Sequence, residues 1–281
     1  MIRKIAVVGA GTMGNGIAQV AAEAGHEVTL FDKNPDGLER GIKRIEQTLT
    51  RNVEKGKIDR SVADQIRNRI HPTSIIGELR DVDFVMEAII EQIEPKKELF
   101  TELDQICKPS TIFASNTSGL SITEMASAVN RSGQVIGMHF FNPVPVMQLV
   151  EIIRGEQTSD DTFQAAHELA EKFHKVAISV KEAPLFAVNR ILTPMINEAI
   201  FVLGEGIASA EDIDKAMMLG ASHPIGPLAL ADLIGLDTML FVVETLYNET
   251  NDSKYRPAPL LRKYVRAGRL GRKSGEGFFK Y

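Results

Sequence analysis

The stretch KIAVVGAGTMGNGIAQVAAEAGHEVTLFD, residues 4–32, decides the fold of this chain. An apolar run at 4–8 leads into a glycine-rich turn, which opens a stretch of helical periodicity and then a β-branched run at 27–31. This order of strand, turn, helix and strand begins a βαβ unit, whose two strands are parallel. We therefore expect a parallel sheet with a ligand site at the glycine turn.

The turn has the spacing G-x-G-x-x-G of dinucleotide-binding sites. In such a site Gly9 permits the tight turn, Gly11 lets a pyrophosphate approach the backbone, and Gly14 lets the helix pack against the strand. Asp32 ends the second strand, where a carboxylate binds the adenosine ribose and repels a 2′-phosphate, so NAD is favoured over NADP. Without Asp32 the glycines would equally fit a surface turn. The expected cofactor-binding residues are Gly9, Gly11, Thr12, Met13, Gly14 and Asp32.

The composition narrows the classes of function. The 281 residues are 44% hydrophobic, carry a formal net charge of -5 and include one cysteine, Cys107. The chain lacks the basic runs of a nucleic-acid-binding protein, the long apolar run of a membrane helix and the cysteine clusters of a metal site. We expect a cytoplasmic protein that binds neither nucleic acid, membrane nor metal.

Strand and helix patterns alternate up to about residue 182, and from Leu185 onward only helical patterns remain. The expected strands are 4–8, 27–31, 84–88, 111–114, 135–139, 149–153 and 177–180. Residues 35–70 have helical periodicity with one face rich in Lys and Arg, which predicts a helical hairpin insertion. We predict a Rossmann-type α/β domain with a mostly parallel sheet over residues 1–184, and an all-helical domain for substrate binding and dimerisation over 185–281.

Polar side chains gather at the ends of later strands, the edge at which open α/β sheets bind ligands. Ser115-Asn116-Thr117-Ser118 directly follows TIFA, and His139 ends a strand in QVIGMHFF. A histidine can take the proton of an alcohol, because its unperturbed pKa lies nearest neutrality. Glu151, amid apolar neighbours in LVEII, needs a partner, and His139 is the obvious one. Helix capping by residues 115–118 and a structural ion pair of Glu151 elsewhere are the alternatives.

Five longer motifs resemble the 3-hydroxyacyl-CoA dehydrogenase family over essentially the whole chain: SNTSG, MHFFNPVPVMQLVEII, APLFAVNRIL, HPIGPLALADLIGLD and RLGRKSGEGFFKY. The resemblance is notable for the short bacterial members that interconvert acetoacetyl-CoA and 3-hydroxybutyryl-CoA. It implies an oxidoreductase that transfers a hydride between NAD(H) and a short-chain (S)-3-hydroxyacyl-CoA/3-oxoacyl-CoA pair. It also implies a CoA thioester as substrate and a role in fatty-acid or butyrate metabolism. A homodimer or higher homo-oligomer is expected because the helical region is rich in Leu, Ile, Met and Val, which suits burial against another subunit.

The same resemblance assigns roles to individual residues. The active site it implies consists of Ser118, His139, Glu151 and Asn189. Ser118 and Asn189 would hydrogen-bond the substrate's 3-oxygen and thioester region. Further cofactor contacts are implied for Glu91, Lys96, Asn116 and Asn142, and contacts with the CoA phosphates for Arg51 and Lys55. Solvated helix charges are the alternative for Glu91, Lys96 and the basic hairpin, and a core hydrogen bond is the alternative for Asn189.

Three positions depart from the family pattern. Leu185 stands where most members have glycine, Gly119 where serine usually follows Ser118, and Gln148 where many have lysine. The changes remove no catalytic group, but they put the acyl-chain preference in doubt. Two other functions stay open: a dehydrogenase of a free hydroxy acid or sugar acid on the same fold, and a catalytically silent NAD-binding protein.

Overall fold

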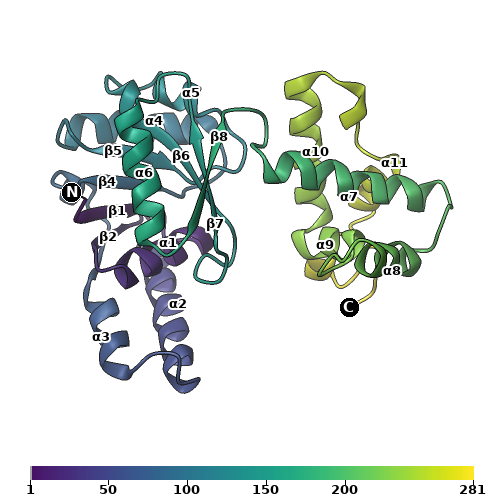
Figure 1. The fold of residues 1–281 in the computed structure, drawn as a ribbon, viewed down its shortest axis with the longest axis horizontal. Coiled ribbons are helices and arrows are strands. Elements are labelled where there is room, and N and C mark those ends of the chain that lie inside the picture. Colours follow the sequence, from purple (N-terminus) through teal and green to yellow (C-terminus); the bar gives the residue numbers. More distant parts are fainter. Residues whose placement is uncertain (1) are drawn as a thin grey trace. The chain divides into compact units, whose positions relative to one another are not determined.

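The protein is described by a computed structural model over residues 2–281. A sheet flanked by helices occupies the first part of the chain, and helices alone occupy the second (Figure 1). Contacts divide the chain after Phe186 into two compact units. The predicted fold class, a Rossmann-type and mostly parallel sheet followed by a helical region, is confirmed.

The eight strands that the structure describes in the first unit lie in one sheet of order β3-β2-β1-β4-β5-β6-β7-β8. The strands are β1 (Lys4–Val8), β2 (Glu27–Phe31), β3 (Ile70–Thr73), β4 (Phe84–Glu87), β5 (Ile112–Ser115), β6 (Val135–Phe140), β7 (Leu149–Arg154) and β8 (Val176–Lys181). Within the described residues every neighbouring pair is parallel except β6 and β7, which are antiparallel. The reversal places residues of β7 directly opposite those that end β6.

One strand was not predicted. β3 has the sequence IHPT, which includes Pro72, and proline cannot donate a backbone hydrogen bond. The structure places β3 at the edge of the sheet, with β2 as its partner. An edge strand tolerates the missing N–H because one side of its ladder is not used. The other strands differ from their expected bounds by at most one residue at either end.

Two apolar cores cover the two faces of the sheet. Ile5 and Val7 of β1 belong to one core and Ala6 and Val8 to the other, because successive side chains of a strand point to opposite faces. Burial on both faces explains why the strand sequence is a continuous apolar run. The covering helices are α1 (Thr12–Glu23), α4 (Ile93–Ile106), α5 (Ile122–Ala126) and α6 (Asp160–Lys172).

Helices α2 (Pro35–Glu54) and α3 (Arg60–Asn68) form a hairpin that projects from the sheet (Figure 1). Asn34 starts α2 because its side-chain oxygen accepts hydrogen bonds from the N–H groups of Asp36 and Gly37, and Pro35 suits the first helical position. Gly41 lets α2 lie close to the glycine turn, since a Cβ at Gly41 would come within 2.6 Å of the Ala10 oxygen.

The second unit packs its helices around a separate apolar core. The helices are α7 (Val188–Gly204), α8 (Ala210–Gly220), α9 (Pro227–Ile234), α10 (Leu236–Thr250) and α11 (Pro259–Arg266). A buried carboxylate fixes the C-terminal tail: Asp232 accepts hydrogen bonds from the N–H groups of Phe278 and Phe279 at 3.0 and 2.9 Å. Between residues 2 and 281 no helix is both long and apolar enough to cross a membrane.

Candidate active site

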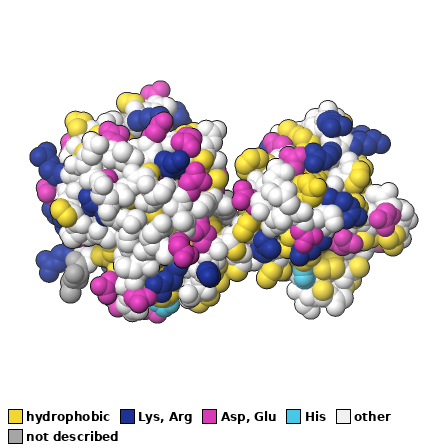
Figure 2. Space-filling model, turned by 90° about the horizontal axis from the view of Figure 1, so that it is seen from above, with side chains coloured by type: hydrophobic (Ala, Val, Ile, Leu, Met, Phe, Trp, Pro, Cys, Tyr) yellow, Lys and Arg dark blue, Asp and Glu magenta, His cyan; other side chains and the backbone are white. Residues whose placement is uncertain are grey.

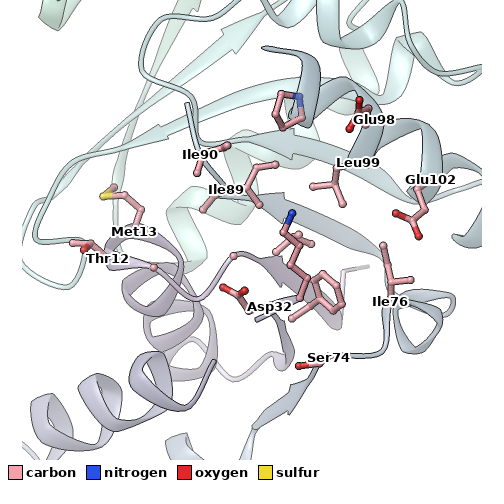
Figure 3. Close-up of a pocket in the computed structure, with 17 residues that line it drawn as sticks. Thr12, Met13, Asp32, Ser74, Ile76, Ile89, Ile90, Glu98, Leu99 and Glu102 are labelled. Atoms are coloured by element: carbon pink, nitrogen blue, oxygen red, sulfur yellow. The ribbon is translucent and has the colours of Figure 1, made fainter. Parts of the chain in front are cut away.

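A cavity of about 730 Å³ opens at the carboxyl ends of β1, β2 and β4 (Figure 3). Its walls include Gly9, Gly11, Thr12, Met13 and Asp32 from the predicted cofactor set. The opposite wall comes from α4 and the segment after β3, with Ile76 and Leu99 as apolar members and Glu98 and Glu102 as acidic ones. This second wall was not predicted, because its residues become neighbours of the glycine turn only through the sheet. Its apolar members could hold the flat adenine ring of a dinucleotide.

The glycine turn has the shape that a dinucleotide requires. Gly9 has φ +99, and a Cβ there would lie 2.6 Å from the Ala88 oxygen. A Cβ at Gly14 would lie 1.7 Å from the Gly9 oxygen, so that glycine allows α1 to pack under the turn. A Cβ at Gly11 would meet nothing within 4 Å, which leaves open space at the N-terminus of α1. Backbone N–H groups and the helix dipole favour a phosphate in that space, so the residues present fit NAD.

Asp32 has a second task besides facing the cavity. Its Oδ2 atom accepts a hydrogen bond from the Ala10 N–H at 2.8 Å, and its Oδ1 atom accepts one from the Asn34 N–H at 2.9 Å. The carboxylate therefore ties the glycine turn to the start of α2. Its negative charge stands where the ribose of an adenosine would lie and disfavours a 2′-phosphate there.

His139 and Glu151 form a buried pair. The antiparallel ladder sets them directly opposite each other on β6 and β7, and the distance from His139 Nδ1 to Glu151 Oε2 is 2.7 Å. The Glu151 side chain is fully buried and that of His139 is 7% exposed. The carboxylate accepts the Nδ1–H, which fixes the tautomer and leaves Nε2 as the atom that exchanges a proton with a substrate.

Aromatic rings surround this imidazole. The ring centroids of Phe141 and Phe186 lie 4.4 and 5.9 Å from that of His139. Asn116, which follows β5, holds the same strand from the side, since its Oδ1 atom accepts the Phe140 N–H at 2.9 Å. The predicted contact of Asn116 with a cofactor stays a prediction, while its contact with β6 fixes the backbone next to His139.

A second group of charges, of which Glu87 and Lys96 are buried, lies at the ends of β4 and β5. Lys96 Nζ lies 2.6 Å from Glu87 Oε1 and 3.4 Å from Glu91 Oε2, and the lysine side chain is 1% exposed. Glu91 Oε1 accepts hydrogen bonds from the Thr117 hydroxyl, the Ser118 N–H and the Ser118 hydroxyl. Lys96 is thus no solvated helix charge, and the structure joins it to Ser118 through Glu91.

Family comparison agrees with this geometry. Residues 4–183 match the NAD binding domain of 3-hydroxyacyl-CoA dehydrogenase, and residues 186–281 match the C-terminal domain of the same family. The chain belongs to the 3-hydroxyacyl-CoA dehydrogenase family. NAD is the cofactor that goes with the matched domain.

Individual relatives cover the whole chain. A probable 3-hydroxybutyryl-CoA dehydrogenase of Bacillus subtilis is 54% identical over 100% of this chain and 98% of its own length. The mitochondrial hydroxyacyl-coenzyme A dehydrogenase of Homo sapiens is 43% identical over 100% of this chain and 92% of its own. The crystal structure of an (S)-3-hydroxybutyryl-CoA dehydrogenase from Ralstonia eutropha has a TM-score of 0.98 and 50% identity, covering 100% of this chain and 99% of that one.

The remaining residues that the family resemblance implied are not among those that line the cavity. Asn142 is exposed in the loop after β6, and Arg51 and Lys55 are exposed at the end of α2. Asn189 lies in the first turn of α7, in the helical unit. Four further residues of the expected cofactor set do not line the cavity: Glu91, Lys96, Asn116 and Gly14. The first three hold the neighbouring strand ends, and Gly14 packs beneath the turn.

Two charged residues of this dehydrogenase were not predicted from the sequence to belong to the site. Glu87 is fully buried at the end of β4. Arg44 of α2 reaches the phosphate-binding turn, where its Nη1 atom lies 3.4 Å from the Thr12 hydroxyl oxygen. The close packing of Gly41 against Ala10, one turn earlier on α2, brings Arg44 there. A glycine at that position of a long helix was the available signal.

Proposed function

We propose that this protein interconverts a short-chain (S)-3-hydroxyacyl-CoA and its 3-oxoacyl-CoA, with acetoacetyl-CoA and 3-hydroxybutyryl-CoA as the preferred pair. The observation that carries the proposal is the buried His139–Glu151 pair, with 2.7 Å between Nδ1 and Oε2, on the sheet that also bears the cofactor cavity. A base of this kind is what the oxidation of an alcohol needs. The names of the bacterial relatives from B. subtilis and R. eutropha support the four-carbon chain.

In the oxidative direction, Nε2 of neutral His139 accepts the proton of the 3-hydroxyl group as the hydride leaves C3. When bound, NAD⁺ supplies the acceptor for that hydride. Glu151 stabilises the imidazolium that forms, because its carboxylate already accepts the Nδ1–H. In reduction, His139 returns the proton to the 3-oxygen.

Ser118 and Asn189 are proposed to donate hydrogen bonds to the 3-oxygen and the thioester region. Partial negative charge on the 3-oxygen makes each such donor worth about 2.7–4 kcal/mol, the range found for single oxyanion-hole donors. Ser118 lies just after β5, and its N–H and its hydroxyl both donate to Glu91 Oε1, at 2.7 and 3.0 Å. The N–H keeps the residue on Glu91 while the hydroxyl turns from Glu91 to the 3-oxygen of a bound substrate. Asn189 belongs to the helical unit, for which we propose roles in substrate binding and dimerisation over residues 185–281.

The CoA group is proposed to contact the basic hairpin. Arg51 in the last turn of α2 and Lys55 just after it carry exposed positive charges that suit the CoA phosphates. A free hydroxy acid or sugar acid would have no use for these residues, so the CoA ester is the better candidate.

The test is the initial rate of NADH oxidation with acetoacetyl-CoA, beside parallel assays with NADPH and with free acetoacetate. Rapid oxidation with NADH and the CoA ester alone would support the substrate class and the role of Asp32 together. Turnover of free acetoacetate at a similar rate would favour the hydroxy-acid alternative. No turnover in protein that still binds NADH would contradict both.

A homodimer formed through the helical unit belongs to the same proposal. This unit bears several large apolar side chains that are more than half exposed, and yellow patches are visible on it in Figure 2. They include Ile191, Ile207, Leu219, Leu233 and Phe241. Sedimentation equilibrium at micromolar concentration should give twice the mass of one chain, and a monomer would contradict the dimer.

A cytoplasmic location is proposed on the state of the one cysteine. Cys107 is buried, and its burial raises the pKa of the thiol to about 11, so the thiol stays protonated and structural. A reducing compartment suits such a chain. Cell fractionation with activity measured in each fraction checks this.

A further inference from the structure

Glu87 is a buried carboxylate that the proposed proton transfer does not use. It is the last residue of β4 and is fully buried. The register of the sheet places it between Val8 of β1 and Ser115 of β5. Burial of an ionised carboxylate in such a place strongly destabilises the folded state unless several hydrogen-bond donors replace the lost water.

Three donors surround this carboxylate. Its Oε1 atom accepts from Lys96 Nζ at 2.6 Å and from the Ile89 N–H at 2.7 Å, and its Oε2 atom accepts from the Ser115 hydroxyl at 2.5 Å. Ser115 in turn accepts the Thr117 N–H at 3.2 Å. Glu87 therefore joins the ends of β4 and β5 to the start of α4.

The chain of contacts continues to the reacting centre. The ammonium group of Lys96 lies 3.4 Å from Glu91 Oε2, and Glu91 Oε1 accepts both the N–H and the hydroxyl of Ser118, at 2.7 and 3.0 Å. Lys96 is held between two carboxylates, of which Glu87 is the closer. If Glu87 lost its charge, the ammonium would draw Glu91 toward itself and away from Ser118.

We propose that Glu87 is a positioning residue for the dehydrogenase reaction: it holds Lys96, which sets Glu91 and through it Ser118 at the reacting centre. This inference rests on the proposed role of Ser118. An ion pair that served only the stability of the fold would have no effect on how much Ser118 contributes to the rate. The two cases therefore differ in a measurable coupling between Glu87 and Ser118.

The experiment is a double-mutant cycle on kcat with acetoacetyl-CoA and NADH, using Glu87→Gln, Ser118→Ala and the double variant. Ser118→Ala should lower kcat by about 100-fold in the native background, as expected for one lost donor to a developing oxyanion. In the Glu87→Gln background the same change should lower kcat by less than about fivefold, because Ser118 is already displaced. Losses that multiply would overturn the proposal.

A matched control lies at the other end of the same strand. Asp83 precedes β4, binds Lys108 at 2.5 Å and also accepts the N–H groups of Arg3 and Lys4. Asp83→Asn removes a comparable ion pair far along β4 from Ser118. In this background Ser118→Ala should keep its full effect of about 100-fold. A reduced effect there would mean that any loss of an ion pair on β4 weakens Ser118, which would overturn a specific role for Glu87.

A second variant guards against misfolding of Glu87→Gln. Glu87→Met with Lys96→Met replaces the buried pair with apolar side chains of similar length, a change that buried ion pairs often tolerate. Native circular dichroism and NADH binding are checked first in each variant, and Ser118→Ala must again lose most of its effect. Failure of the native protein to turn over acetoacetyl-CoA would contradict the proposed function instead. A native enzyme indifferent to Ser118→Ala would overturn the link through Ser118.

Discussion

The two ends of β4 carry similar ionic groups in different surroundings. At the carboxyl end, the fully buried Glu87 binds Lys96 and continues through Glu91 to Ser118. At the amino end, Asp83 is 23% exposed, binds Lys108 and fastens the backbone at the start of β1. Only the ion pair at the carboxyl end adjoins residues that we propose to act in the reaction, because the carboxyl ends of parallel strands are where open α/β sheets bind ligands.

At the amino end of β4, the charge of Asp83 is stabilised by a few donors. Desolvation raises the pKa of Asp83, but hydrogen bonds from Lys108 and from the Lys4 and Arg3 N–H groups outweigh it and lower that pKa to about 2. Its contribution to stability is therefore present above pH 4 or so and is lost as the pH falls toward 2. No reacting group of the proposed site takes part in this contact.

The largest effect should come from His139 at the carboxyl edge. His139→Gln removes the base while leaving the glycine turn and Asp32 in place, so kcat should fall by about 10²–10⁴-fold with NADH affinity unchanged. NADH fluorescence titration and steady-state rates on the same preparation check this. Loss of turnover and NADH binding together would mean that His139 is structural, and the contrast between the two edges would weaken.

Glu151→Gln should have a smaller effect on the same edge. The amide keeps the shape of the side chain but no longer stabilises the imidazolium, and a hydrogen bond to a charged group is worth about 1.5–3 kcal/mol. We expect kcat to fall by about 10–100-fold, since each 1.4 kcal/mol or so is tenfold in rate. An unchanged kcat would show that the 2.7 Å contact only holds β6 and β7 together.

Asp83→Asn tests the amino edge. The lowered pKa of this group, from 3.8 to about 2, corresponds to about 2 kcal/mol of stability at neutral pH. Urea unfolding at pH 7 should show this loss, with kcat unchanged. The difference in stability between native protein and variant should shrink between pH 4 and pH 2 or so, and a constant difference would mean that the carboxylate is not the cause.

The smallest effect concerns two departures from the family pattern that touch each other. A Cβ at Gly119 would lie 2.7 Å from Leu185 Cδ2, and Leu185 has φ +62, a conformation that favours glycine. Gly119→Ser alone should cost about 1 kcal/mol by overpacking, because the Leu185 Cδ2 atom is the end of a flexible side chain and can shift.

Leu185→Gly supplies the matching half of this test. It relieves the backbone strain but leaves a void, and the double variant should recover most of the stability that Gly119→Ser loses. Thermal unfolding of the four proteins measures this coupling. Additive losses would show that the two departures arose independently and do not compensate each other.

What could be predicted from the sequence was local or followed a known pattern. The glycine turn and Asp32 lie within one βαβ unit, so spacing alone brought them together. Glu151 could be paired with His139 because a carboxylate amid apolar residues needs a partner. The same argument applied to Glu87 at the end of FVME would have marked it as buried and partnered.

The partners of Glu87 were harder to find. Lys96 lies on the next helix and Ser115 on the neighbouring strand, and only the parallel register of β4 and β5 brings Ser115 to the carboxylate. β3 was not predicted either, and its Pro72 fits a strand because β3 lies at the edge of the sheet, a position that the sequence does not reveal. Contacts that depend on which strands are neighbours cannot be predicted from spacing along the chain.

The two hydrogen bonds of Asp32 constrain any attempt to re-engineer cofactor preference. Its carboxylate selects against a 2′-phosphate and also anchors the Ala10 N–H at the crest of the phosphate-binding loop. Exchange for a small apolar residue would admit NADP only by loosening the loop that must hold either nucleotide. Asparagine or serine, which keep an acceptor without the charge, are the better starting points for a switched enzyme.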